Sequence, residues 1–296
     1  MILVTGGTGF VGRNIVRLLV KKGQRVKCLV RKSSPRNVLD GLDVEFCTGD
    51  ILVPGTLKEA LQDIDTVIHL VGIIKEIKGA TFERIHSEGT KNILEAARNA
   101  EVKKYIHMSA LGTRPGGISR YHKTKWQAEE VVRNSGLKYV ILRPPIICGA
   151  DDEFVNMFAK MIRQTFITRI IPVIGKGESR MQPIYVGDVA HCFYEAALND
   201  NILNKTYEIG GPDAISFNEI LDTIMKVMQK NRFKIHLPMA MFKPLAFLME
   251  KTLKDPPLNR DQLIMLREDN VCDITDMKRD FNIQPMPFED AIRTYL

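Results

Sequence analysis

The sequence contains few cysteines, and their arrangement excludes two classes of protein. Five cysteines are scattered through 296 residues, an odd number with no C-x-x-C pair among them. Disulfide-bonded secreted domains and structural zinc sites require paired or closely spaced cysteines. The pattern therefore argues against a disulfide framework and predicts no metal site. It favours a reducing compartment, and we expect the protein in the cytoplasm.

Long apolar runs are also missing. The stretch that comes nearest to a membrane span, residues 235–249, is interrupted by Pro238, Lys243 and Pro244 and is too short to cross a bilayer. We interpret residues 239–249 as a buried helix face rather than as a dock for a quinone or a lipid. Met1 leads straight into an apolar segment with no basic region before it, so we expect no signal peptide.

No concentrated stripe of basic residues is visible along the chain. The net charge is +7, with 42 Lys and Arg against 35 Asp and Glu, but the basic residues are spread and form only short pairs such as Lys21 and Lys22. Nucleic-acid binding typically needs a basic patch with interleaved aromatic residues. We therefore predict no nucleic-acid partner and attribute the charge to solvated faces and an anionic ligand.

The beginning of the chain carries the strongest motif, an apolar run that gives way to glycines and then to a segment with helical periodicity. Gly7, Gly9 and Gly12 satisfy the spacing G-x-G-x-x-G, and Gly6 with the last two gives G-x-x-G-x-x-G. Between a strand and a helix, such glycines permit a tight turn, let backbone approach a diphosphate, and let the helix pack closely on its strand. The motif predicts a dinucleotide whose diphosphate lies on the N–H groups at the start of the helix.

Predicted strands and helices then alternate. The strands are mostly apolar without period-two alternation, which is typical of a parallel sheet covered on both faces. We therefore predict an α/β fold: a doubly wound Rossmann sheet, formed by residues 1–149 and about 182–200, with a smaller C-terminal α+β substrate lobe, formed by residues 150–181 and 201–296. That lobe is expected to supply a substrate lid. Predicted strands cover residues 25–30, 44–47, 66–71, 104–108, 139–143 and 206–209, and predicted helices cover residues 9–20, 56–62, 81–100, 120–134, 151–163, 189–198, 217–229, 238–252 and 288–296.

The end of the second predicted strand bears on the choice of cofactor. An NAD site usually places an Asp or Glu about 20 residues past the glycines, on the ribose hydroxyls, and this sequence has Arg31 there. A guanidinium cannot accept those hydroxyl protons, but it pairs well with a 2′-phosphate, and Lys32, Ser33 and Arg13 would add donors. We predict NADP as the preferred cofactor, with NAD as the alternative. Asp50, after the third strand, is expected near the adenine, although such a Gly-Asp turn is common without a ligand.

Tyr121 and Lys125 are four residues apart near the start of a predicted helix, so both side chains lie on one face. A neighbouring ammonium favours the phenolate, which should lower the pKa of the tyrosine and make it a usable acid or base. Ser109, at the end of the strand predicted over residues 104–108, precedes Tyr121 by twelve residues and could hold a substrate hydroxyl or carbonyl. Alone, such a Tyr and Lys pair is also typical of an amphipathic surface. Downstream of the glycines, we interpret the three residues as a catalytic set.

Further motifs accompany these: Gly89-Thr90-x-Asn92, Leu142-Arg143-Pro144-Pro145 and Asp188-Val189-Ala190. In this order, over residues 1 to about 212, the chain resembles the short-chain dehydrogenase/reductase superfamily, in its extended or atypical epimerase/dehydratase-like branch. Other details resemble the NAD(P)H-binding group that includes the 39 kDa accessory subunit of respiratory complex I. These details are Arg31 after the second strand, His-x-Glu-Gly-Thr at residues 86–90, and Gln182-Pro183 before the aspartate.

The resemblance implies a role for each residue of the catalytic set. Tyr121 would be the acid/base, Lys125 would bind the nicotinamide ribose and tune Tyr121, and Ser109 would orient the substrate. Two departures matter: His86 stands where many extended members have Asn, and the interval from Ser109 to Tyr121 is shorter than in sugar-nucleotide epimerases. We assign to the cofactor site Thr5, Gly6, Gly7, Thr8, Gly9, Phe10, Val11, Gly12, Arg13, Arg31, Lys32, Ser33, Asp50, Ile51, Leu70, Val71, Gly72, Tyr121, Lys125 and Pro144.

Two classes of function fit these residues. The first is an enzyme that transfers hydride between nicotinamide and a carbonyl or alcohol, or performs epimerase or dehydratase chemistry on a sugar nucleotide. Basic residues of the expected lid, such as Arg163 and Arg169, would suit an anionic substrate, although lids are often basic for solubility. The second, which the resemblance to the complex I group implies, is a structural or assembly protein that holds NADPH without turnover. Expected partners are a small-molecule substrate and either a second copy of the chain or a larger respiratory complex.

Overall fold

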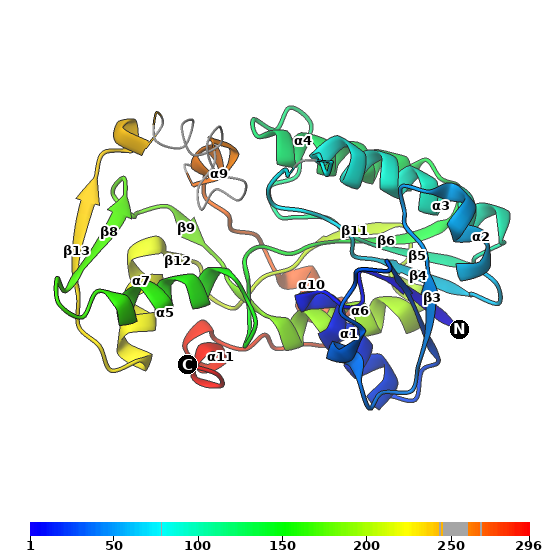
Figure 1. The fold of residues 1–296 in the computed structure, drawn as a ribbon, viewed down its shortest axis with the longest axis horizontal. Helices are drawn as coiled ribbons and strands as arrows, with labels where there is room; N and C mark the ends of the chain where they lie inside the picture. Colours follow the sequence, from blue (N-terminus) through cyan, green and yellow to red (C-terminus); the bar gives the residue numbers. More distant parts are fainter. Residues whose placement is uncertain (78, 243, 245–259, 267) are drawn as a thin grey trace. The chain divides into compact units, whose positions relative to one another are not determined.

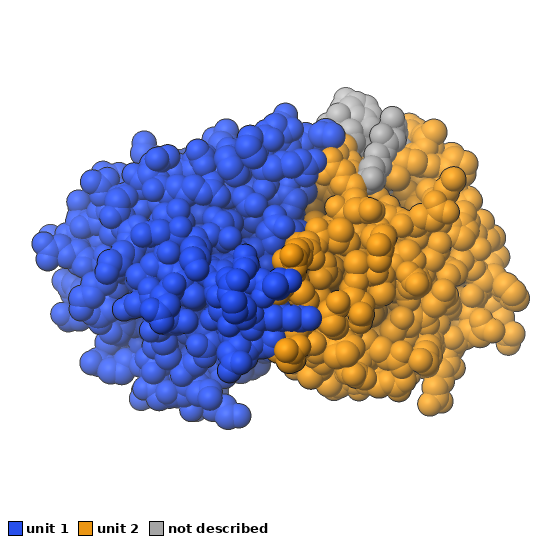
Figure 2. All heavy atoms as spheres, turned by 180° about the vertical axis from the view of Figure 1, so that it is seen from behind, with its two compact units in different colours: residues 1–144, 186–209, 275–283 blue, residues 145–185, 210–274, 284–296 orange. Residues whose placement is uncertain are grey.

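The structure is a computed structural model that describes residues 1–77, 79–242, 244, 260–266 and 268–296. The chain divides into two compact units, which Figure 2 colours separately. Unit 1 comprises residues 1–144, 186–209 and 275–283, and unit 2 comprises residues 145–185, 210–274 and 284–296. Each unit therefore combines segments that lie far apart in the sequence.

Unit 1 is built on a seven-stranded parallel sheet with the strand order β11-β6-β5-β4-β1-β2-β3 (Figure 1). Successive strands run outward from β1 in one direction and from β4 in the other, so this is the doubly wound Rossmann arrangement that the sequence predicted. In such sheets ligands bind outside the carboxyl ends of the strands at the point where the order reverses, here between β1 and β4. The strands are β1 (Ile2–Thr5), β2 (Val26–Val30), β3 (Val44–Thr48), β4 (Thr66–His69), β5 (Lys104–Met108), β6 (Lys138–Arg143) and β11 (Lys205–Glu208).

Helices cover both faces of this sheet. α1 and α6 pack against each other on one face, while α2, α3 and α4 cover the other (Figure 1). None of the helices in the described part of the chain is both long and apolar enough to cross a bilayer. The helices and helical turns are α1 (Phe10–Lys21), η1 (Arg36–Leu39), η2 (Pro54–Thr56), α2 (Leu57–Ala60), η3 (Glu83–Glu88), α3 (Gly89–Asn99), α4 (Arg120–Arg133), α6 (Val186–Leu198), η4 (Asp200–Ile202) and α10 (Thr275–Asp280).

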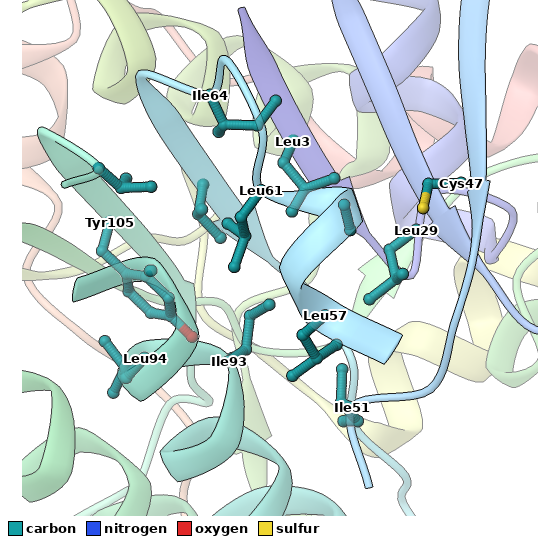
Figure 3. Packing of buried hydrophobic residues seen from close by; sticks show 14 of the residues in the cluster. Leu3, Leu29, Cys47, Ile51, Leu57, Leu61, Ile64, Ile93, Leu94 and Tyr105 are labelled. Carbon is teal, nitrogen blue, oxygen red and sulfur yellow. The ribbon is translucent and has the colours of Figure 1, made fainter. Parts of the chain in front are cut away.

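The core beneath α2 and α3 shows why the strands are apolar on both sides. Leu3 of β1 and Tyr105 of β5 pack with Leu57 and Ile93 of the two helices, all fully buried (Figure 3). Val4, one residue along β1, points to the opposite face, toward α1. Each of the aliphatic side chains among them contributes roughly 1.5–3 kcal/mol when it leaves water. Because both alternating sets are buried, the strands carry no period-two pattern.

The helix predicted over residues 81–100 consists of two elements. η3 (Glu83–Glu88) is π-helical, and α3 (Gly89–Asn99) continues from it. The apolar periodicity of the sequence cannot distinguish a single wide turn from regular helix. π-Helical turns occur frequently at functional sites, and this one carries His86.

Unit 2 is assembled from short strands and amphipathic helices around its own core. Val155, Phe158 and Ile162 of α5 and Ile220 and Ile224 of α7 are among its buried side chains. Its strands form three pairs, β10 with β7 and β13 with β8 in parallel and β12 with β9 antiparallel. The elements are β7 (Ile147–Cys148), α5 (Phe154–Gln164), β8 (Ile170–Ile174), β9 (Arg180–Met181), β10 (Ile184–Tyr185), β12 (Ile215–Ser216), α7 (Phe217–Val227), β13 (Phe233–Leu237), α9 (Arg260–Met265) and α11 (Phe288–Arg293).

The structure corrects several sequence-based boundaries. β8 and β13 were not predicted, because their pairing joins segments more than sixty residues apart. Residues 201–209 and 275–283, which we assigned to the smaller lobe, belong to unit 1: β11 pairs with β6, and the Asp280 carboxylate accepts a hydrogen bond from the Tyr207 hydroxyl at 2.6 Å. Residues 145–149 and 182–185, assigned to the Rossmann domain, belong to unit 2, because β7 and β10 pair there. Most of the helix predicted over residues 238–252, with its apolar run, lies outside the described residues.

Candidate functional site

The glycines between β1 and α1 have separate steric roles. Gly6 has φ +77°, a left-handed conformation that permits the turn. A Cβ on Gly12 would lie 2.1 Å from the Gly6 carbonyl oxygen, so only glycine lets the helix start so close to the loop. A Cβ on Gly7 would lie 2.8 Å from the Cys28 sulfur on β2. These three glycines are therefore required by the loop itself, before any ligand is considered.

Gly9 is different, because its Cα faces open space. It is exposed and is the N-cap of α1, and a Cβ there would have a single neighbour within 4 Å, the Gly6 oxygen at 3.3 Å. The first intrahelical bond runs from the Arg13 N–H to the Gly9 oxygen at 2.9 Å, so the N–H groups of Phe10, Val11 and Gly12 have no partner within the helix. α1 has no acidic residue in its first turn. This helix start therefore fits the diphosphate of a dinucleotide.

We expect Gly9→Val to abolish binding of NADPH while the fold is retained. The branched side chain would stand over the N–H groups at the start of α1, in the space a diphosphate needs, and would meet little of the protein. Calorimetric titration of NADPH measures the effect. Gly55→Val in η2, where no atom lies within 4 Å of an added Cβ, is the matched control. An unchanged titration curve for the Gly9 variant would refute the assignment of this loop to the cofactor.

The end of β2 brings basic residues next to this loop. β2 pairs with β1, with Leu29 opposite Thr5, and Arg31, Lys32 and Ser33 follow at the carboxyl edge with exposed side chains. A turn holds the segment, because the Arg31 N–H donates to the Ser34 hydroxyl at 3.1 Å and the Ser34 N–H donates to the Arg31 oxygen at 3.0 Å. Arg31 thus follows β2 at the edge of the sheet where the sequence predicts a 2′-phosphate. Arg13, half-buried on α1, was assigned to the same group.

The loop after β3 is held by local contacts. Asp50 accepts a bond from the Leu52 N–H at 2.9 Å, so one carboxylate oxygen already serves a turn. The motif Gly89-Thr90-x-Asn92 fixes the next residue, Ile51: the Asn92 amide donates to its oxygen at 2.9 Å, and a Cβ on Gly89 would lie 2.5 Å from its side chain. The motif therefore has a structural role that sequence reasoning did not identify.

The loop after β4 lies beside the glycine loop. A Cβ on Gly6 would lie 3.4 Å from both the backbone and the side chain of Val71. Leu70, before it, is buried, and Gly72 after it is exposed. Pro144, after β6, accepts a hydrogen bond from the Leu111 N–H at 2.8 Å. The residues assigned to the cofactor after β1, β2, β3, β4 and β6 thus follow the carboxyl ends of the strands of one sheet.

The structure buries the predicted catalytic set at the same edge. Ser119 caps α4 by accepting the His122 N–H, so the helix begins just before Tyr121. Lys125, one turn on, donates from Nζ to the Met108 oxygen at 3.0 Å. Since Met108 ends β5 and Ser109 follows it, this bond ties Lys125 to the serine's strand end. Ser109 itself is buried and donates to the Thr113 hydroxyl at 3.4 Å.

Burial changes the electrostatics that the sequence predicted. We expected the Lys125 ammonium to lower the pKa of Tyr121, but burial raises that pKa to about 12. The cause is the removal of Tyr121 from water, since an ionised phenol loses its hydration. Burial also lowers the pKa of Lys125 to about 8, against the opposing effect of the Glu129 carboxylate. At neutral pH the site therefore holds a protonated phenol beside an ammonium.

An aromatic cluster that sequence reasoning missed surrounds Tyr121. His86 makes an edge contact with its ring at 5.4 Å and stacks on Phe82. One His86 nitrogen bonds the Thr124 hydroxyl at 2.9 Å, and the other lies 3.0–3.1 Å from the backbone of Ile73. His86 thus joins α4 to the loop after β4. The sequence signal was present, because His86 is the position where the chain departs from the Asn of many extended members.

A second buried contact links the strands. His69, at the end of β4, bonds the Thr5 hydroxyl at 2.7 Å and the Thr90 hydroxyl at 3.3 Å. Its ring stacks on that of His107 on β5, 5.7 Å between centroids. Burial, together with the smaller effect of the Lys125 charge, lowers the pKa of His69 to about 3 and that of His86 to about 2. These histidines are therefore neutral at pH 7.

α4 is anchored to the sheet by a buried ion pair. Glu129 is fully buried and accepts two bonds from Arg143, at 2.8 and 2.7 Å. Arg143 ends β6 and is followed by Pro144, so the Leu-Arg-Pro-Pro motif fastens the helix that carries Tyr121 and Lys125. No cluster of His, Cys, Asp and Glu able to hold a metal ion occurs among the described residues.

Residues 2–210 match the model of the NAD dependent epimerase/dehydratase family. The chain belongs to this family. Among curated proteins it is similar to the NADH dehydrogenase (ubiquinone) 1 alpha subcomplex subunit 9, mitochondrial, of Arabidopsis thaliana, with 30% identity over 301 residues that cover 95% of this chain and 73% of the relative. It is also similar to a ceramide reductase of Caulobacter vibrioides, with 34% identity over 191 residues, 64% of this chain and 58% of that protein.

Among solved structures, a UDP-glucose 4-epimerase of Thermotoga maritima matches the family fold over the whole chain. The TM-score is 0.77 with 20% identity, over 99% of this chain and 96% of the epimerase. At that identity the match supports the Rossmann-like fold alone. The family and its fold thus agree with the resemblance found in the sequence, while the roles of Ser109, Tyr121 and Lys125 remain predictions.

Proposed function

We propose that the protein is an NADPH-dependent oxidoreductase that reduces a carbonyl, with Tyr121 as the proton donor. The observation that carries the proposal is the burial of Tyr121 and Lys125 on one face of α4, with the Lys125 Nζ bonded to the Met108 oxygen beside Ser109 at 3.0 Å. A phenol whose pKa is raised to about 12 is fully protonated at neutral pH. It is therefore suited to give a proton to an oxygen on which negative charge develops.

Each residue has a defined task in this proposal. The cofactor, when bound, supplies hydride to the substrate carbon. Tyr121 donates its hydroxyl proton to the substrate oxygen, and the Lys125 ammonium stabilises the phenolate that remains. Ser109 holds the same oxygen through its hydroxyl. His86, packed on the edge of the Tyr121 ring and bonded to Thr124, keeps the phenol in position. Fixed donors aimed at developing charge are effective because they need no reorganisation.

The proposal includes a preference for NADP over NAD, and Arg31 should determine this preference. Arg31→Asp would place a carboxylate beside the 2′-phosphate, so the preference should move toward NAD by roughly 1–3 kcal/mol, the size of a charge-assisted hydrogen bond. The ratio of the NADPH and NADH dissociation constants measures it. Arg25→Asp, an equal charge change immediately before the first residue of β2, is the control. If the ratio is the same in wild type and in the Arg31 variant, another residue reads the phosphate.

A second function is favoured by one observation, the similarity to a respiratory-complex subunit along 95% of this chain. In that case the protein holds the cofactor as a structural element and associates with a larger complex, and no substrate is turned over. The two functions differ in what the bound cofactor does. A reductase must release oxidised cofactor after reaction, whereas a structural protein retains the reduced form.

The deciding experiment begins with native mass spectrometry of the purified protein, which identifies the nucleotide and any second ligand that copurify. A panel of aldehydes, ketones, quinones and sugar nucleotides is then followed by NADPH absorbance. Substrate-dependent loss of NADPH supports the reductase, and epimerised product without net NADPH loss supports epimerase chemistry. Tightly retained NADPH, with neither NADPH loss nor epimerised product on any compound of the panel, would contradict both enzymatic forms and favour the structural function.

A further inference from the structure

Unit 2 contains two segments that together account for the positive charge of the chain. Residues 154–177 and 223–242 contain eight Lys and Arg and no Asp or Glu, while the whole chain has a net charge of +7. The rest of the protein is therefore close to neutral. The sequence alone made the basic residues look scattered, because the two segments lie far apart along it. The eight are Lys160, Arg163, Arg169, Lys176, Lys226, Lys230, Arg232 and Lys234.

The fold brings these segments together. β8 and β13 pair in parallel, with Ile170 opposite Phe233, and the Phe233 N–H donates to the Arg169 oxygen at 2.7 Å. The Arg232 guanidinium donates to the Ile162 oxygen at 3.1 and 2.8 Å, so the start of β13 lies against the last turn of α5. The turn between α5 and β8 therefore sits beside the start of both strands.

Large apolar side chains are exposed at this place. Phe166 and Ile167, in the turn after α5, are 68% and 79% exposed, and Phe233 is 71% exposed. Along β8 and β13 the outward positions continue with Ile170 and Ile235, which are also exposed. The inward positions of β8 are buried in the core of unit 2. We call the five exposed side chains and the neighbouring Arg163, Arg169, Lys230 and Arg232 the basic apolar surface.

The cations of this surface are not neutralised by the fold. Two of the eight basic residues, which are not part of this surface, form ion pairs. Lys226 pairs with Glu289 at 2.8 Å, and Lys234 pairs with Asp222 at 2.7 Å. Arg163, Arg169 and Lys230 are exposed and form no ion pair with any residue that the structure describes. Exposed apolar side chains cost free energy in water, and a cluster of them rimmed by unpaired charge of one sign marks a contact surface.

We propose that the basic apolar surface docks unit 2 on the anionic surface of a lipid membrane. Phe166, Ile167 and Phe233 enter the headgroup region, and the arginines and Lys230 meet lipid phosphates. A cation near an anionic leaflet contributes about 1 kcal/mol, and an apolar side chain that leaves water adds more. An acidic protein would match the cations alone, whereas a bilayer interface takes both the cations and the consecutive Phe-Ile pair. This docking is independent of the proposed reaction.

Cosedimentation with lipid vesicles tests the proposal. The full chain should bind vesicles of mixed phosphatidylglycerol and phosphatidylcholine, bind vesicles of phosphatidylcholine at least about tenfold more weakly, and lose affinity as salt screens the charges. Phe166→Ser with Ile167→Ser should weaken binding by at least about tenfold. Arg163→Glu with Arg169→Glu should also weaken vesicle binding by at least about tenfold, because the lipid phosphates would repel the new carboxylates. Circular dichroism melting curves check that each variant is folded.

Matched controls separate the surface from net charge. Lys91→Glu with Arg98→Glu reverses the same amount of charge at exposed positions of α3 in unit 1. Val53→Ser removes a half-exposed apolar side chain just before η2, also in unit 1. Both should bind vesicles as wild type does. Failure of the wild-type chain to bind anionic vesicles would overturn the proposal, as would equal losses in the α3 control or full binding by the folded Phe166 and Ile167 variant.

Discussion

Tyr121→Phe should lose about 10²- to 10⁴-fold in turnover, the usual contribution of a positioned acid or base, while the affinity for NADPH stays nearly unchanged. The variant keeps the ring that packs against Phe82 and His86 and removes only the hydroxyl. Because burial raises the pKa of Tyr121 to about 12, its hydroxyl stays protonated near neutral pH. Steady-state kinetics on a substrate from the panel, with NADPH titration of the same sample, gives both quantities.

Lys125→Met is the companion variant, and it should behave differently. It should lose turnover and weaken cofactor binding together, since the ammonium is proposed to contact both the phenolate and the ribose. In the wild type, kcat/KM should fall as the pH rises past about 8, the lowered pKa of Lys125, because that parameter reports ionisations of the free enzyme. Full activity of Tyr121→Phe would remove Tyr121 from the mechanism, whereas equal losses of cofactor affinity in both variants would indicate a structural role for the pair.

Acid should unfold unit 1 well above the pH at which carboxylates protonate. His69, His86 and His107 are buried, and burial lowers the pKa of each. A base whose pKa is lower in the folded state binds fewer protons there, so stability is complete above the unfolded value near 6.5 and falls as the pH drops below it. At pH 5 each of these histidines lowers the free energy of unfolding by about 2 kcal/mol. Three of them together approach the whole stability of an ordinary domain, about 5–15 kcal/mol.

The single tryptophan makes this measurable for unit 1 alone. Trp126 lies on α4, so its fluorescence during an acid titration follows the unfolding of that unit. His107→Leu removes a titrating ring whose two nitrogens have no hydrogen-bond partner among the described residues, and it should shift the unfolding midpoint to lower pH. His236→Gln, at an exposed position of β13, should leave the midpoint in place. Identical midpoints for wild type and His107→Leu would show that this ring does not control acid stability.

The sequence predicted the fold of unit 1 well because its signals are local. Each strand is a short apolar run followed by a polar turn, and the alternation with helices restricts such strands to a parallel sheet. The strand predicted over residues 104–108 matches β5, and the helix predicted over 120–134 differs from α4 by one residue. The glycine spacing predicted the loop between β1 and α1 because its requirements, a left-handed turn and a close approach, are backbone properties.

Unit 2 was predicted less completely, since its strands have two to five residues and pair across long separations. The pairing of β8 with β13 joins Ile170 to Phe233, and no local pattern announces it. The same pairing concentrates charge that looks dispersed along the chain. A sequence predicts which residues share a helix face, but it does not predict which distant segments meet.

The sequence by itself determined the family, the sheet, and the identity of the residues at its carboxyl edge: the glycines, Arg31, and the pair of Tyr121 and Lys125 on one helix face. Only the tertiary structure decided which of the titratable residues carry a charge at neutral pH. Burial raises the pKa of Tyr121 and lowers that of Lys125, and it keeps three histidines neutral around them. The reason is physical: spacing is a property of the chain, whereas the free energy of a charge depends on the water that the folded protein removes from it.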